Sequence, residues 1–127
     1  MALLALLLPG HGVQAAEAAI LTLSCSGTTT SLIGVDNKPE PVANMGLEVN
    51  LTERTVTGFV VPARIGKIDT TSVEFTGKNG NWSVSGSMDR ITGSVWAITL
   101  ALHPTKPEKV ITNDSWDLLC KPVRRLF

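Results

Sequence analysis

Apolar and polar residues alternate along most of the chain after residue 19, and this period of two predicts β-strands rather than helices. The alternation is clearest in ILTLSCS (20–26) and SWDLLCK (115–121), where every second residue is apolar or a cysteine. These residues are Leu21, Leu23 and Cys25 in the first segment, and Trp116, Leu118 and Cys120 in the second. Side chains two apart lie on one face of a strand, so both cysteines are predicted to face a core.

Two hairpins are predicted where apolar residues oppose one another across a short turn. A two-residue turn at Glu53–Arg54, within 45–62, predicts the pairs Leu51–Val56, Val49–Gly58 and Leu47–Val60. In 70–86, Asn79–Gly80 is typical of a type I′ turn, whose two central residues both take positive φ. That turn predicts the pairs Phe75–Val84 and Val73–Gly86, and it places Trp82 over Gly77.

The stretch GSMDRITGS (86–94) joins the next two strands, and the length of its connection decides which side chains face the core. A two-residue turn would put large apolar residues on the face of two serines. The residues concerned are Trp96, Ile98 and Leu100, with Ser83 and Ser85. A three-residue connection, Asp89-Arg90-Ile91, instead predicts the pairs Met88–Thr92, Gly86–Ser94, Val84–Trp96 and Trp82–Ile98. We therefore expect a three-residue or bulged turn here.

The remaining segments are less regular. The segment 28–44 is predicted to begin as a strand and end as a loop, because it contains Pro39 and Pro41. The segment 64–69 is a short strand or an edge strand, and 103–114 is a long connection with two prolines. The fold class is therefore all-β, an antiparallel meander of about seven or eight strands. A closed or nearly closed barrel is expected, with a two-sheet sandwich as the alternative.

The first residues have the layout of an export signal, with a seven-residue apolar run, a Pro-Gly break and then small residues. We expect cleavage after Ala15 or Ala18, so that 1–18 is a signal peptide and 19–127 is a single β domain. The alternative is an N-terminal core helix, since the run is too short to span a bilayer. Because no Lys or Arg precedes the run, we expect the natural start to lie upstream.

The two cysteines, Cys25 and Cys120, predict a disulfide between the terminal strands, as an even pair does in an exported protein. Basic and acidic residues balance at eleven each, which argues against nucleic acid as a partner because phosphate binding needs a basic surplus. Beyond the signal, no stretch is long enough to predict a transmembrane segment. We expect a periplasmic or secreted monomer.

The sequence contains no recognisable catalytic or metal-binding pattern. His103 is the one histidine beyond the predicted signal, the chain has no tyrosine, and no G-x-S-x-G motif occurs. Cysteine and histidine ligands at zinc spacing are missing, as are calcium-loop patterns. The carboxylates available for a glycosidase pair are Asp69, Glu74, Asp89, Asp114 and Asp117. Two acids often face one another by chance in a small barrel, so we predict no enzyme, no cofactor and no metal.

Asp89 and Arg90 are the first candidates for an interaction site. An Arg at a rigid loop tip can enter a partner's cleft or hold an anion, whereas an Asp at a turn start commonly accepts backbone N–H bonds. We favour the structural role for this pair. Lys121, Arg124 and Arg125, near the C-terminus, are a second candidate. The tryptophans share the predicted core face and are expected to fill the interior: Trp82, Trp96 and Trp116.

Three stretches carry a resemblance to known proteins: LSCSGTTTSLIG (23–34), GSMDRITGSV (86–95) and LLCKPVRRLF (118–127). The chain resembles small exported proteins of unknown function from alphaproteobacteria, of the rhizobial type. This resemblance implies export to a Gram-negative periplasm, and it implies no activity, ligand or catalytic residue. A looser architectural likeness is to periplasmic β-barrel inhibitors of lysozymes and proteases. The chain lacks the Ser-Gly-x-x-Tyr type of stretch of those lysozyme inhibitors, because it has no tyrosine.

We therefore expect a periplasmic, non-enzymatic binding or interaction module whose partner is a protein or a small ligand. One alternative is an inhibitor that presents Arg90 or the 103–114 segment to a hydrolase. Another is a lipocalin-like carrier of a small apolar ligand, for which an eight-stranded interior has just enough room. An apolar cavity of about a few hundred Å³ would distinguish the carrier, and a packed interior would exclude it.

Overall fold

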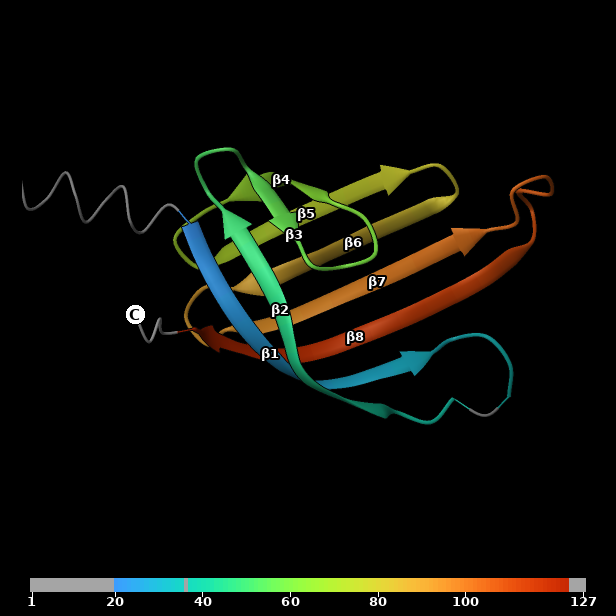
Figure 1. The fold of residues 1–127 in the computed structure, drawn as a ribbon, viewed down its shortest axis with the longest axis horizontal. Coiled ribbons are helices and arrows are strands. Elements are labelled where there is room, and N and C mark those ends of the chain that lie inside the picture. The colour runs from blue at the N-terminus through green and yellow to red at the C-terminus, as the bar shows by residue number, and fades with distance from the viewer. Residues whose placement is uncertain (1–19, 36, 124–127) are drawn as a thin grey trace, which may run out of the picture.

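Eight antiparallel strands close into a barrel in the computed structural model, which describes residues 20–35 and 37–123 (Figure 1). The strands are β1 (Ile20–Ser31), β2 (Glu40–Asn50), β3 (Thr55–Thr57), β4 (Ala63–Ile68), β5 (Ser72–Asn79), β6 (Trp82–Asp89), β7 (Ser94–Leu102) and β8 (Val110–Pro122). Each strand pairs with its neighbour in sequence, and β1 pairs with β8. The predicted all-β meander is confirmed, and the architecture is a closed barrel rather than a sandwich. The predicted signal peptide, 1–18, lies outside the described residues.

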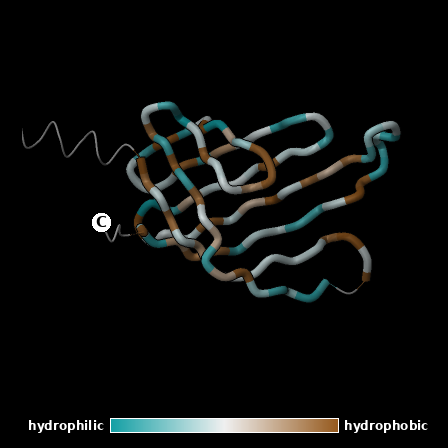
Figure 2. Tube along the Cα trace, viewed as in Figure 1, coloured by the Kyte–Doolittle hydropathy of each residue, from teal (hydrophilic) through white to brown (hydrophobic). Residues whose placement is uncertain are grey.

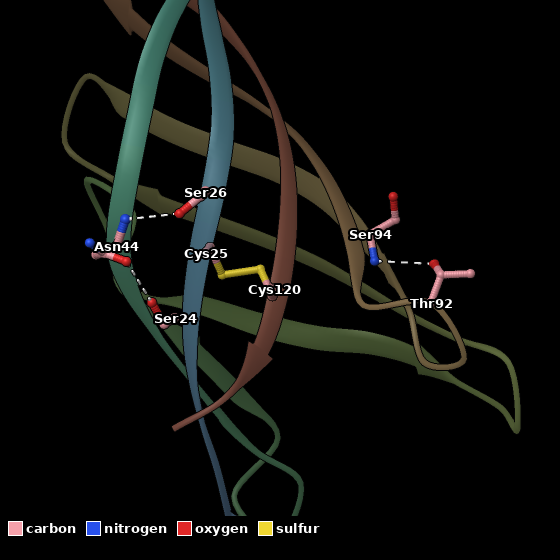
Figure 3. The surroundings of a disulfide bond; sticks show 7 residues. All are labelled: Ser24, Cys25, Ser26, Asn44, Thr92, Ser94 and Cys120. Atoms are coloured by element: carbon pink, nitrogen blue, oxygen red, sulfur yellow. Dashed lines mark hydrogen bonds between the residues drawn. A yellow bond between two sulfur atoms is a disulfide. The ribbon is translucent and has the colours of Figure 1, made fainter. Parts of the chain in front are cut away.

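The barrel closes where β1 meets β8, and the predicted disulfide lies at this seam. Cys25 and Cys120 are direct partners in the β1–β8 register, and their sulfurs are bonded (Figure 3). Both side chains are buried in the core, with Leu23 and Leu118 on the same inner face. The predicted strand faces at both ends of the chain are therefore confirmed.

Hydrophobic and hydrophilic positions alternate along the strands because one face of each strand forms the interior (Figure 2). The interior is filled mainly by aliphatic side chains, with Phe75 and Met88 among them. Its largest fully buried members are Leu118, Val49, Val73, Val95 and Cys25.

The first two hairpins keep the predicted faces, but in each the partner of a given residue lies two positions from the predicted one. In the first, Val49 lies opposite Val56, and a four-residue connection, 51–54, replaces the predicted turn at Glu53–Arg54. The predicted partner of Leu47, Val60, is instead 49 % exposed in the connection after β3.

In the second hairpin the turn residues are Gly80 and Asn81, and Phe75 lies opposite Gly86 rather than Val84. Only Gly80 of this turn has positive φ, at 62°, which fits a type II′ turn rather than the predicted type I′. A Gly at the first central position of a two-residue turn favours type II′. The aromatic ring that covers a bare glycine is therefore Phe75 over Gly86, not Trp82 over Gly77.

The predicted register of the third hairpin is wrong, and the opposite face of β7 points inward. Four residues, 90–93, connect Asp89 to Ser94, so that Met88 pairs with Val95. The inward residues of β7 are small, whereas the large apolar ones point outward. The inward set is Val95, Ala97, Thr99 and Ala101, and the outward set includes Trp96, Ile98 and Leu100.

Two physical reasons explain this outcome. The carboxylate of Asp89 accepts hydrogen bonds from the backbone N–H groups of Ile91 and Thr92, which holds the longer connection closed. The ring of Phe75 also lies over Gly86, whose neighbour on β7 is Ala97, so the interior has room there only for a small residue. The limited space inside the barrel therefore decides which face of β7 points inward, although the outward residues are larger and more hydrophobic.

Two of the three less regular segments also differ from their predictions. β2 already begins at Glu40 and contains Pro41, whose missing N–H is tolerated because β3 pairs only with the far end of β2. The 64–69 segment forms β4, which confirms the first of the two alternatives, a short strand, and it lies between β3 and β5 rather than at an edge. β8 begins at Val110, so the last connection is shorter than the predicted 103–114.

Reduction of the disulfide should lower the free energy of unfolding by about 4–5 kcal/mol, because the bridge closes a loop of 95 residues. Urea unfolding of the native protein with and without dithiothreitol measures this difference. The double variant Cys25→Ala/Cys120→Ala is the control and should show no response to dithiothreitol. Equal stability of the oxidised and reduced native protein would contradict the prediction.

The register of β7 can be tested with two adjacent substitutions. Val95→Ala should cost about 2 kcal/mol because it opens a cavity in the core. Trp96→Thr should cost less than about 1 kcal/mol, because the Trp96 side chain is 53 % exposed. Chemical denaturation of both variants measures the order, and a larger cost for Trp96→Thr would restore the register predicted from the sequence.

Candidate functional site

A pocket of about 520 Å³ opens at the barrel end where β1 begins and β8 ends. Connections 51–54, 69–71 and 90–93 meet at this end, which we call the mouth. The lining comes from the inner faces of strands and from the connections above them. It consists of Leu21, Leu23, Leu51, Val73, Met88, Asp89, Arg90, Ile91, Thr92, Gly93, Cys120, Lys121 and Pro122. Most of this surface is apolar, so the mouth can accept an apolar molecule.

The floor of the pocket is formed by side chains that point inward because residues alternate between the two faces of a strand. Leu23, Val73 and Met88 are buried residues on the inner faces of β1, β5 and β6. They fill the barrel below the mouth and leave the space above them open. Leu51 and Ile91 extend the apolar lining into the connections, and Ile91 is 75 % exposed.

The 90–93 connection is held rigidly over one side of the mouth. The Asp89 carboxylate accepts the N–H groups of Ile91 at 2.8 Å and Thr92 at 3.0 Å, and the Asp89 carbonyl accepts the Gly93 N–H at 2.9 Å. The hydrogen bonds from Thr92 and Ile91 lower the pKa of Asp89 from its ordinary value. The predicted structural role of Asp89 at a turn is therefore confirmed.

Gly93 joins this connection to β8, the strand that carries Cys120. Its carbonyl accepts the Cys120 N–H at 2.8 Å, and its φ is 82°. A Cβ at this position would collide with the Cys120 carbonyl oxygen, so only glycine allows the close approach. The loop at the mouth is thus fixed directly to the seam of the barrel.

Arg90 binds the neighbouring connection rather than standing free at a loop tip. Its backbone N–H donates to the Thr71 carbonyl at 2.7 Å, and its guanidinium donates to the Asp69 carbonyl at 2.5 Å. The Asp69 carboxylate in turn accepts the N–H groups of Thr71 and Ser72, which lowers the pKa of Asp69 to about 2. Arg90 therefore ties the 90–93 and 69–71 connections together.

The basic C-terminal candidates are only partly described. Lys121 is exposed and lines the rim of the mouth, so the structure brings it to the same site as Asp89 and Arg90. Arg124 and Arg125 lie outside the described residues. The apolar lining was missed in the sequence, although apolar residues in connections, Leu51 and Ile91, were an available signal.

The three tryptophans do not share one face. Trp82 and Trp116 are half-buried and point inward, as predicted, whereas Trp96 points outward. Trp96 points outward because the register of β7 differs from the predicted register. The indole N–H of Trp116 donates to the hydroxyl of Thr99 at 3.0 Å, which fixes this ring inside the barrel.

The chemistry of the mouth favours binding. Among its described lining residues, the titratable groups are Asp89, Arg90 and Lys121, besides the disulfide-bonded Cys120. The Asp89 carboxylate and the Arg90 guanidinium already hold connections in place. No group of three His, Cys, Asp or Glu side chains in 20–35 and 37–123 is arranged to hold a metal ion. The same ranges contain no helix with the length and apolar character to cross a membrane.

Comparison with known protein families, with curated proteins and with solved structures finds no match to this chain. The function must therefore be argued from the site itself.

The lowered pKa of Asp69 predicts a pH-dependent contribution to stability. The folded state holds the carboxylate ionised down to about pH 2, whereas the ordinary pKa is 3.8. This stabilisation should be complete above about pH 4 and should be lost as the pH falls through 2. Thermal unfolding of the native protein and of Asp69→Asn should show a difference that shrinks over this range.

Asp117→Asn is the matched control, because Asp117 is exposed on the outside of β8 and makes no such backbone hydrogen bonds within the described residues. A difference between Asp69→Asn and the native protein that stays constant from pH 5 to about pH 2 would contradict the assignment.

Proposed function

We propose that this protein is an exported, non-enzymatic binding module that takes a small apolar molecule in the mouth of its barrel. The observation that carries the proposal is the apolar pocket of about 520 Å³ at that end. Small-molecule sites are typically apolar hollows of about 300–1,000 Å³, and barrel mouths are a common place for them. This differs from the carrier expected from the sequence, because the interior is packed and the proposed ligand lies in the mouth above the core.

The rigidity of the mouth supports the proposal. Connection 90–93 is bonded to β8 through Gly93 and to connection 69–71 through Arg90. A pocket whose walls are already ordered loses little conformational entropy when a ligand enters. The site is therefore prepared for a ligand of fixed size.

The proposed compartment is the periplasm. The buried disulfide is typical of oxidising compartments, and it agrees with the expected export signal at 1–18. The resemblance to small exported alphaproteobacterial proteins supports the same location.

The inhibitor alternative is less well supported. The form that uses Arg90 needs an arginine that is free to enter a partner's cleft, whereas the guanidinium of Arg90 already donates to the Asp69 carbonyl, and nothing in the structure singles out the 103–114 segment as the alternative probe. Removing this side chain would disturb the mouth itself, so we do not assign Arg90 to a partner.

The test uses the neutral apolar dye N-phenyl-naphthylamine, whose fluorescence rises when it leaves water. The dye should bind the purified protein, and decanol should displace it. Leu51→Lys places an ammonium group at the half-buried wall of the pocket and should weaken dye binding about tenfold, because the charge opposes an apolar occupant.

Val60→Lys is the matched control, since Val60 is an exposed apolar residue in a connection at the opposite end of the barrel. This variant should bind the dye as the native protein does. Equal weakening by Leu51→Lys and Val60→Lys, or no dye binding by the folded native protein, would overturn the proposal.

A further inference from the structure

The inner face of the barrel changes from apolar to polar toward the end opposite the mouth. On β1, the inner positions run from Leu23 and Cys25 to Thr29 and Ser31, and the β8 positions opposite them change in step. Thr29 pairs with Trp116, and Ser31 pairs with Asp114. The polar residues therefore lie on the face that carries the disulfide and the core.

A second pocket, of about 320 Å³, lies at this polar end. Its lining is Thr29, Ser31, Lys38, Glu40, Asp114 and Trp116. Three adjacent strands, β2, β1 and β8, supply five of these residues, and Lys38 precedes β2. The mouth pocket shares none of them, and the buried Leu118 lies between the two linings along β8.

The charged groups of this pocket are not used by the fold. Within the described residues, no hydrogen bond or ion pair engages the side chains of Lys38, Glu40 or Asp114, and the one ion pair joins Lys67 to Glu74. Lys38 and Glu40 are exposed and Asp114 is half-buried, so all three side chains can be reached from solvent. They are therefore available to a ligand.

Trp116 provides a fixed aromatic wall. Its indole N–H is bonded to Thr99, and its ring meets Phe59 edge to face, with centroids 5.8 Å apart. Phe59 is in turn stacked on Phe75 of the core. The ring is thus held in place before any ligand arrives, as a binding wall requires.

We propose that this pocket binds a neutral saccharide. The carboxylates of Glu40 and Asp114 accept hydrogen bonds from hydroxyl groups, and the ammonium of Lys38 donates one. The two carboxylates oppose an anion, and the ammonium offsets one of their charges and so weakens the attraction for a cation, which favours an uncharged ligand rich in hydroxyls. The indole ring offers an apolar surface for the C–H face of a sugar ring.

This inference does not rest on the proposed apolar ligand, because the two pockets lie at opposite ends of the barrel and can fail separately. The test follows the indole N–H resonance of Trp116 by NMR during titration of the purified protein. The probes are maltotriose and chitotriose as neutral sugars, trigalacturonate as an anion, and spermidine as a cation.

A neutral trisaccharide should shift this resonance at millimolar concentration. Asp114→Asn and Glu40→Gln should each weaken its binding about tenfold, because each removes a charged acceptor while keeping the shape of the side chain. Two matched controls should bind like the native protein: Asp117→Asn on the outer face of β8, and Glu48→Gln on the exposed face of β2.

Three results would overturn the inference. The first is no shift with either neutral sugar, and the second is a shift with spermidine or trigalacturonate alone. The third is equal weakening by the outer-face controls. Leu51→Lys should leave sugar binding unchanged, which separates this site from the mouth.

Discussion

The pairing of β1 with β8 is the constraint on which the rest of the structure depends. Without it the eight strands would form an open meander with two unpaired edges. The Cys25–Cys120 disulfide links these two strands near the mouth end of their register. Cys120 also donates its N–H to Gly93, so the connection over the mouth takes its position from the seam. The strand pair that closes the barrel therefore also positions one wall of the apolar pocket.

The two ends of the barrel differ in chemistry because the inner face changes character along the strands. At the mouth, residues such as Leu21 and Met88 surround an apolar space. At the other end, Asp114 and Glu40 lie on the same inner face, beside Trp116. The packed core between them keeps the two spaces apart, so one small domain carries two separate surfaces for ligands.

The alternation of residues was sufficient to predict the fold class, the terminal strands and the disulfide, because each depends only on which face a side chain takes. The register of the paired strands depended also on specific contacts between side chains and backbone. The Asp89 carboxylate stabilises a four-residue connection, and Phe75 over Gly86 leaves room for Ala97 rather than a large residue. The first contact sets the length of a connection and the second joins three different strands, and the alternation of residues reveals neither. The mouth was missed for the same reason, since its lining comes from four strands and their connections.

The proposed binding of an apolar molecule in the mouth is tested most directly by locating the residues that the bound ligand contacts. Intermolecular nuclear Overhauser effects between bound decanol and the methyl groups of selectively labelled Met, Leu and Ile residues measure this. Contacts to Leu51, Met88 and Ile91 at the mouth are expected. Contacts confined to Leu119, which is exposed on the outer face of β8, would contradict this expectation and would show that the ligand adheres to the outside of the barrel.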